Sequence, residues 1–268
     1  MRVNQITNSW AIQRLWQLQN VQTNLATQLS TGRIPLAANV ASATIAEKLR
    51  SQIAGYREAM NATYNAIGML NVAEGGLSSI TIALQRMREL AIQAANSTLT
   101  ESERAALQQE FDQLSNQINK ISQQLNYNNI KVLAGDVENF QVQTGPNAGQ
   151  NISITIPKIT VETLGLSNVN ISNVQNAQQA IQRIDQALEM VSNVRSYVGS
   201  VTNRLEAAAR ELGNTMINTI SSLSTISDVD MAKTVMEFVK NRLLTQSTVG
   251  VMAQSNVSRF SILKILLG

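Results

Sequence analysis

Residues 3–34 read VNQITNSWAIQRLWQLQNVQTNLATQLSTGRI, and residues 231–267 read MAKTVMEFVKNRLLTQSTVGVMAQSNVSRFSILKILL. Both stretches are poor in Gly and in charge, and their apolar residues recur at steps of three and four, which puts each set on one helix face. In the first stretch these residues are Val3, Ile6, Trp10, Leu15, Leu18, Val21, Leu25 and Leu29. In the second they are Met231, Val235, Phe238, Val249, Met252, Val257, Phe260, Leu263 and Leu267. Each helix must hide its stripe against the other helix or against copies of itself on neighbouring molecules. A chain that uses both termini in this way is predicted to be a building block rather than a catalyst.

The composition supports helices that pack against other subunits. Charged residues make up 15% of the 268 residues, well below the usual quarter, and aromatic residues make up 4%. Gln and Asn occupy flank positions where a solvent-facing coiled coil carries Glu and Lys, as at Gln13, Gln17 and Asn24. Uncharged flanks suit buried interfaces, because a charge is costly to desolvate.

Charge and hydropathy exclude several classes of partner. The net charge of +3 comes from 21 basic and 18 acidic residues that are dispersed along the chain, which argues against nucleic acid. Arg2 is followed by polar residues rather than by an apolar segment, so we expect no cleavable signal peptide. No uninterrupted apolar run approaches the length of a membrane span, so we expect no membrane insertion. If the protein is exported, it leaves by a route that does not use a classical signal.

The first half of the chain predicts three helices. Gly32 and Pro35 end the first of them, and residues 36–46 predict a linker or a short helix. A long helical pattern runs from about residue 45 to 95, where Gly68, Gly75 and Gly76 mark weak points or the close approach of another helix. Thr100 and Glu103 form a capping box that begins a helix reaching about residue 125, and residues 127–129 end it.

The second half predicts a small β element and two more helices. Apolar and polar residues alternate around Phe140, Val142, Ile152, Ile154 and Ile156, on either side of a turn cluster at 145–149. This pattern predicts a β-hairpin over about residues 138–160, which we expect at the tip of the bundle. Residues 174–223 return to the helical period, and residues 227–230 break it before the terminal helix.

The predicted fold is mainly α: a long antiparallel helical coiled-coil bundle with a small β-hairpin at mid-sequence. Residues 1–43 and 227–268 form a terminal coiled-coil domain, and residues 44–226 form a helical domain that carries the hairpin. The residues expected to carry terminal coiled-coil packing are Trp10, Leu18, Leu25, Leu29, Met252, Phe260, Leu263 and Leu267. For Trp10 we interpret the indole as coiled-coil or subunit packing rather than a ligand-stacking surface.

Catalytic and metal chemistry lack their usual residues. The chain has no His and no Cys, which removes the Ser-His-Asp triad and the common zinc ligands. No glycine-rich phosphate loop occurs. The acidic pairs at 101 and 103 and at 228 and 230 are interpreted as charge favoured at helix starts, and Arg86, Arg88 and Glu89 as a solvated helix face. We therefore assign no catalytic, cofactor-binding or metal-binding residue.

Several stretches resemble bacterial flagellin, in the order in which that family has them. The most specific is LQRMRELAIQAAN at residues 84–96, preceded by VAEGGL at 72–77. LSTGRI at 29–34, GSVTNRLE at 199–206 and DVDMA at 228–232 are also similar to the family. Tyr127-Asn128-Asn129 stands where the family usually has Phe-Asn-Gly. No insertion follows the hairpin, so the resemblance implies a short form that lacks variable outer domains and builds a thin, smooth filament.

The resemblance implies a structural, non-enzymatic subunit that is secreted and polymerises into the extracellular filament of the bacterial flagellum for motility. Residues 1–43 and 227–268 would form its inner tube and residues 44–226 the surrounding tube. The implied partners are copies of the chain itself, an export chaperone, hook-junction and cap proteins, and a vertebrate toll-like receptor. Arg86, Leu90 and Glu110 match receptor contacts of the family on a surface used for assembly. Their spacing predicts that Arg86 and Leu90 share one exposed helix face, with Glu110 joining them from the next helix.

Two other functions compete with the filament subunit. A hook–filament junction protein of the same superfamily shares the terminal helices but usually lacks the motif at residues 86–96. An enzyme on a helical scaffold is the third hypothesis, and the family's protease insertions need a His-rich metal motif that this chain does not have.

Overall fold

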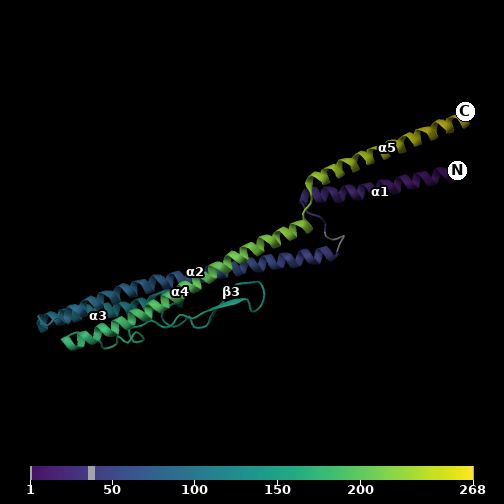
Figure 1. Ribbon diagram of the computed structural model, residues 1–268. Coiled ribbons are helices and arrows are strands. Elements are labelled where there is room, and N and C mark those ends of the chain that lie inside the picture. The colour runs from purple at the N-terminus through teal and green to yellow at the C-terminus, as the bar shows by residue number, and fades with distance from the viewer. Residues whose placement is uncertain (1, 36–39, 268) are drawn as a thin grey trace. The chain divides into compact units, whose positions relative to one another are not determined.

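The computed structural model describes the backbone of residues 2–35 and 40–267 and the side chains of residues 9–35, 40–255 and 257. The described residues form five helices and two small antiparallel strand pairs, and the chain is 75% helical, which confirms the predicted fold class (Figure 1). In chain order the elements are α1 (Arg2–Thr31), α2 (Val40–Ala94), α3 (Glu101–Gln124), β1 (Asn126–Tyr127), β2 (Ile130–Lys131), β3 (Phe140–Gln143), β4 (Asn151–Ile154), α4 (Val174–Ser227) and α5 (Met231–Leu267).

The helix ends follow the local signals. α1 stops at Thr31 because Gly32 adopts a φ of +66°, a left-handed conformation that glycine reaches without strain. α2 begins at Val40, so most of the expected linker is helical, and residues 36–39 lie outside the described residues. α2 also continues unbroken through Gly68, Gly75 and Gly76. The interpretation that another helix comes close holds at Gly76, where an added Cβ would lie 2.4 Å from the side chain of Leu125 at the end of α3.

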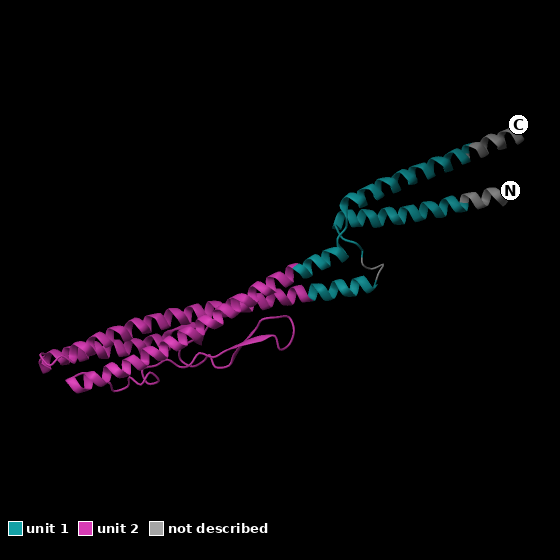
Figure 2. Ribbon diagram, viewed as in Figure 1, with its two compact units in different colours: residues 1–51, 218–268 teal, residues 52–217 magenta. Residues whose placement is uncertain are grey.

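The chain divides into two compact units (Figure 2). Unit 1 contains residues 1–51 and 218–268, and unit 2 contains residues 52–217. Both divisions fall inside a helix, α2 or α4, so each of these long helices contributes to both units.

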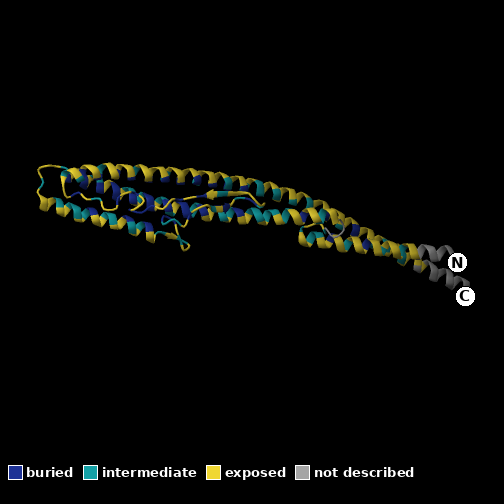
Figure 3. Cartoon of the chain, turned by 90° about the horizontal axis from the view of Figure 1, so that it is seen from below, coloured by how far each residue is buried: buried dark blue, intermediate teal, exposed yellow. Residues whose placement is uncertain are grey.

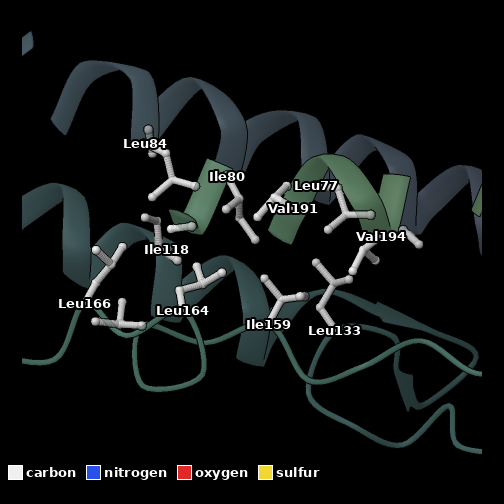
Figure 4. Close-up of a cluster of buried hydrophobic side chains, with 14 of the residues drawn as sticks. Leu77, Ile80, Leu84, Ile118, Leu133, Ile159, Leu164, Leu166, Val191 and Val194 are labelled. Carbon is white, nitrogen blue, oxygen red and sulfur yellow. The ribbon is translucent and has the colours of Figure 1, made fainter. Parts of the chain in front are cut away.

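Unit 2 is built around a core that α2, α3 and α4 share with the irregular segments beside them. On α2 the buried residues recur at steps of three and four, as at Leu70, Leu77, Leu84 and Met87. Figure 4 shows side chains from α2, α3 and α4 meeting those of Leu133, Ile159, Leu164 and Leu166 from the irregular chain. Figure 3 shows the same pattern along the helices, with buried residues on their inner faces and exposed residues on their outer faces.

Polar side chains of α3 hold the irregular chain in place. Gln108 Oε1 accepts a hydrogen bond from the Ile171 amide at 2.6 Å, and Asn119 Oδ1 accepts one from the Val161 amide at 3.2 Å. The buried Ser122 hydroxyl donates to the Leu133 carbonyl at 3.1 Å. These contacts satisfy backbone groups that no strand or helix would otherwise pair.

The turn between α2 and α3 is fixed by the predicted capping box and by Arg104. The Thr100 hydroxyl accepts from the Glu103 amide, and the Glu103 carboxylate accepts from the Thr100 amide at 2.8 Å, which confirms the box. The Arg104 guanidinium donates to the carbonyls of Ala94, Asn96 and Leu99 at 3.2, 2.8 and 2.6 Å. It thereby pairs with the carbonyl of the last α2 residue, Ala94, and with two carbonyls of the turn.

The predicted hairpin exists, but it does not lie at the tip. β3 pairs with β4 so that Phe140 faces Ile154 and Val142 faces Ile152. Val142 and Ile154 are buried in the unit 2 core, and the hairpin lies beside the helices (Figure 1). Its turn reaches α2 at Gly55, where an added Cβ would lie 2.8 Å from the Pro146 side chain. The end of unit 2 is formed instead by the turn at residues 95–100, because the apolar face of the hairpin needs a helix to cover it.

A second strand pair was missed. β1 and β2 join through Asn128 and Asn129, whose φ values are 48° and 66°. Two-residue strands carry no detectable period, but consecutive Asn residues are a signal for a tight hairpin turn because Asn tolerates positive φ.

One described helix, α2, contains a stretch that is long and apolar enough to cross a membrane by length and composition alone. The mean hydropathy of that 18-residue stretch is 1.3, and 44% of it is buried inside the protein. The buried stripe of α2 accounts for this composition, because a helix that packs into a core passes the same test.

Candidate functional site: the terminal helix pair

α1 and α5 run antiparallel in unit 1 and meet along a regular seam. On α1 the buried and half-buried positions of this seam are Ala11, Leu15, Leu18, Gln22, Leu25 and Leu29. On α5 they are Thr234, Phe238, Asn241, Thr245, Thr248 and Met252. Both sets alternate steps of four and three residues, which is the heptad spacing of a coiled coil.

The α5 side of this seam is largely polar. Asn241 is buried, and its Nδ2 donates to the Leu18 carbonyl of α1 at 2.8 Å. Thr234 is also buried, and its hydroxyl turns back to the Asp230 carbonyl of its own helix at 2.8 Å. A polar group in a coiled-coil seam lowers the stability of the pair relative to an apolar one. The contact between α1 and α5 is therefore weaker than its regular spacing suggests.

The apolar residues of α5 lie mostly outside the seam. Val235, Met236, Val239, Leu243 and Leu244 are exposed, with 60% of Leu243 accessible to solvent. They form one apolar surface along the helix, which we call the α5 ridge. A groove beside the ridge lies between the two helices and has Leu18, Val21 and Leu25 among its lining residues. Contiguous exposed apolar surface of this kind is typical of an interaction site.

The base of the helix pair is closed by backbone hydrogen bonds. The Ile34 amide donates to the Ser227 carbonyl at 2.8 Å, and the Val229 amide donates to the Gly32 carbonyl at 3.1 Å. Asp230 caps α5 by accepting from the Lys233 amide at 3.1 Å, as the helix-start interpretation predicts. The hydroxyls of Ser224 and Ser227 hold the pKa of Asp228 below its usual value.

The predicted terminal packing residues fall into three groups. Leu18 and Leu25 are buried in the seam, and Leu29 and Met252 are half-buried there. Trp10 is 68% exposed, so it does not pack in the seam of a single chain, because the heptad spacing selects Ala11 at that level. The side chains of Phe260, Leu263 and Leu267 lie outside the described residues.

Two of the three residues predicted to share a surface, Arg86 and Glu110, lie together, and Leu90 does not join them. Glu110 Oε1 lies 2.8 Å from Arg86 Nη2 and accepts from Arg86 Nε at 2.9 Å, and the hydrogen bond to Glu110 raises the pKa of Arg86. Leu90 has no solvent-accessible surface, so the prediction that it shares an exposed face is wrong. Four residues turn a helix by about 40° beyond a full circle, which carries Leu90 into the core stripe beside Met87 and Ala94.

Two ion pairs between α2 and α4 were missed by sequence reasoning. Arg88 Nε lies 2.6 Å from Asp185 Oδ1, and Arg195 Nη2 lies 2.6 Å from Glu74 Oε1. The bond to Glu74 raises the pKa of Arg195. The partners are 97 and 121 residues apart in the sequence, so no local pattern could pair them. Among the residues that the structure describes, no group of three potential metal ligands comes together.

The comparisons with known proteins agree with this architecture at both ends of the chain. A family profile for the bacterial flagellin N-terminal helical region matches residues 3–138, and one for the bacterial flagellin C-terminal helical region matches residues 181–266. The chain belongs to the bacterial flagellin family. It is 38% identical to a flagellin of Halalkalibacterium halodurans over 230 residues, 85% of each chain. It is 31% identical to the flagellar filament 30.7 kDa core protein of Treponema maltophilum over 284 residues, which cover 99% of this chain and 100% of that protein.

Solved flagellar structures share the fold. The crystal structure of Bacillus cereus flagellin matches with a TM-score of 0.51 and 26% identity, covering 57% of this chain and 88% of that one. A putative flagellar hook-associated protein from Vibrio parahaemolyticus matches with a TM-score of 0.60 over 71% of this chain and 99% of that one, at 14% identity. The second likeness concerns the fold alone. Flagellin-family membership therefore rests on the sequence matches, and the helical architecture is the one expected of that family.

Proposed function

We propose that this chain is a structural subunit that polymerises with copies of itself into the filament of the bacterial flagellum. The observation that carries the proposal is the arrangement of polar and apolar residues on α5. Polar Thr234 and Asn241 are buried toward α1, whereas the apolar α5 ridge is exposed to solvent. A filament covers such a ridge with neighbouring copies, whereas a monomer exposes it to water. The relatives named flagellin and flagellar filament core protein, which match 85% and 99% of the chain, support this function.

The two domains predicted from the sequence have different roles in this proposal. Residues 1–43 and 227–268 form the inner tube of the filament through their apolar terminal helices. Residues 44–226 form the surrounding tube, whose subunits fold independently of assembly because unit 2 has its own continuous core. The heterologous contact of one surface with a different surface on the next copy extends without closing, which is how identical subunits build a helical polymer.

Further partners follow from family membership. We infer an export chaperone, hook-junction proteins and a cap protein for a subunit that is secreted to an extracellular flagellum. Arg86 and Glu110 form an exposed pair that is available to a neighbouring subunit or to a toll-like receptor. Leu90 belongs to the core and is not part of that surface.

The proposal is tested by elongation of filament seeds. Purified chain is mixed with sheared filaments, and sedimentation and electron microscopy measure the polymer. The Leu243→Glu variant places a charge on the α5 ridge and should abolish elongation, because that charge would have to be desolvated at each new contact. Its melting temperature should remain close to that of the parent, since 60% of Leu243 is exposed.

The matched control is Leu243→Met, which keeps an exposed apolar side chain of similar volume at the same position. This variant should elongate like the parent. A parent chain that adds only one short layer to each seed would identify a junction protein instead of a filament subunit. Normal elongation by Leu243→Glu would show that the ridge is not an assembly surface.

A further inference from the structure

The methionines of this chain differ sharply in exposure. Met69 and Met87 lie in the unit 2 core, where their thioethers are closed off from solvent. Among the methionines whose side chains the structure describes, Met236 is the most exposed, with 67% of its surface accessible. Met231 on α5 and Met190 on α4 are also exposed, at 47% and 41%. A peroxide in solution can therefore reach the sulfur of Met236 while the core sulfurs are protected.

The surroundings of Met236 set it apart from Met190. Val239 and Leu243 follow Met236 by three and seven residues on the same helix face, and both are exposed. All three side chains line one shallow, mostly apolar surface of α5, to which Lys240 and Ser247 also contribute. Met190 lies on α4, outside this surface of α5. A polar group added at position 236 would therefore fall beside the apolar side chains of Val235, Val239 and Leu243.

We propose that Met236 is an oxidation site and that its sulfoxide form cannot enter the filament. The oxidant is a peroxide such as hydrogen peroxide. The thioether sulfur attacks one peroxide oxygen, a sulfur–oxygen bond forms as the oxygen–oxygen bond breaks, and water leaves. The thioether loses two electrons, and the peroxide is reduced by the same two electrons.

The consequence follows from the change in polarity. A sulfoxide is polar and strongly hydrated, so burying it against an apolar partner leaves its oxygen without a hydrogen bond. Subunits that are oxidised before assembly would be rejected, while a neighbouring copy would shield Met236 in an existing filament. This inference rests on the proposed function, because it takes the α5 ridge to be an assembly surface.

The first test measures oxidation alone. The free chain and preformed filaments are treated with hydrogen peroxide, and the sulfoxide at each methionine is quantified by mass spectrometry. In the free chain Met236 should oxidise at least about tenfold faster than Met87, because only exposed sulfur reacts readily. In filaments that advantage should disappear. Equal rates at Met236 and Met87 in the free chain, or an undiminished rate at Met236 in filaments, would overturn the inference.

The second test measures elongation of untreated seeds by oxidised chain. The parent and Met190→Leu should both lose elongation after peroxide treatment. Met236→Leu, which keeps a similar apolar volume, should retain most of its elongation. An oxidised parent that elongates normally, or a Met236→Leu variant that is inactivated like the parent, would contradict the inference. If untreated parent chain fails to elongate seeds, the proposed function itself is wrong, and that result is separate from the oxidation rates of the free chain.

Discussion

At the scale of single residues, Arg86 and Leu90 show how one helix face divides between solvent and core. They lie one turn apart on α2, yet Arg86 pairs with Glu110 at the surface and Leu90 is fully buried. The spacing of four residues predicted a shared exposed face, and that prediction is wrong because the two positions differ by about 40° around the helix, which separates the surface from the core. Whether a residue at the edge of the apolar stripe is exposed or buried depends on where α3 and α4 pack against α2.

Because Leu90 is buried and Arg86 is exposed, substitutions at the two positions should change the stability of the protein by very different amounts. Leu90→Ala should lower the free energy of unfolding by about 2 to 5 kcal/mol, because it leaves a cavity in the core. The double variant Arg86→Ala with Glu110→Ala should leave the melting temperature nearly unchanged, because an exposed ion pair contributes little to stability. Urea denaturation monitored by circular dichroism measures both. A large loss of stability in the double variant would contradict the assignment of this pair to the surface.

The Glu103 carboxylate gives a prediction for pH dependence. The bond from the Thr100 amide, with that from the Thr100 hydroxyl, lowers the pKa of Glu103 from its ordinary value of 4.5. A lowered folded-state pKa stabilises the protein above the ordinary value, and this contribution is lost as the pH falls through the folded pKa. Glu103→Gln keeps the capping geometry but lacks the charge.

The parent should therefore melt at a higher temperature than Glu103→Gln at neutral pH, and the gap should close as the pH falls below 4.5. Asp228 has a pKa shifted in the same direction and is present in both proteins, so the gap isolates Glu103. Thermal melts across this range check the prediction. A gap that stays constant down to acidic pH would show that the Glu103 charge contributes nothing.

At the scale of elements, the turn between α2 and α3 depends on one cation. Arg104 reaches three carbonyls of that turn through a rigid planar fork, which a lysine ammonium cannot reproduce. Arg104→Lys should lower the free energy of unfolding by about 1 to 2 kcal/mol, since hydrogen bonds from charged donors are among the stronger ones. The control is Arg204→Lys on the exposed face of α4, which should be neutral in the same urea titration. Equal stabilities of the two variants would show that the hydrogen bonds of Arg104 do not stabilise the turn.

The hairpin gives a second prediction at this scale. Ile154 is fully buried opposite Phe140, so Ile154→Asp should unfold unit 2 or destabilise it severely, because an unpaired charge would be buried. Gln141→Asp adds the same charge to the partner strand on its exposed face and should melt like the parent. Similar melting of both variants would show that the hairpin does not pack against the helices.

The elements also show how far sequence reasoning extends. The long helices follow from steps of three and four residues, and the hairpin follows from the alternation around Val142 and Ile154. The β1–β2 pair was missed because two residues carry no period, although Asn128 and Asn129 signal its turn. The hairpin's position beside α2 depends on a contact between Gly55 and Pro146, which are 91 positions apart, and no local pattern encodes such a contact.

At the scale of the whole molecule, the apolar stripes of the two ends were expected to meet each other or neighbouring copies. The structure divides that expectation between two surfaces. Leu18 and Leu25 of α1 pack in the seam, whereas Val235 and Leu243 of α5 remain exposed. The sequence alone does not show which face of α5 packs against α1. The hydrogen bond from Asn241 to the Leu18 carbonyl identifies that face, and it is the polar one.

The central claim is that the terminal helices complete their packing only when subunits assemble. Hydrogen exchange with mass spectrometry, on free chain and on filaments, tests it most directly. In the free chain, amides of α1 and α5 should exchange at least about tenfold faster than buried amides of α2 and α4 in unit 2, because weakly packed helices open at low cost. In filaments the exchange of α1 and α5 should slow to the rate of unit 2. Strong protection of both terminal helices in a verified monomer, or unchanged fast exchange in filaments, would contradict the account.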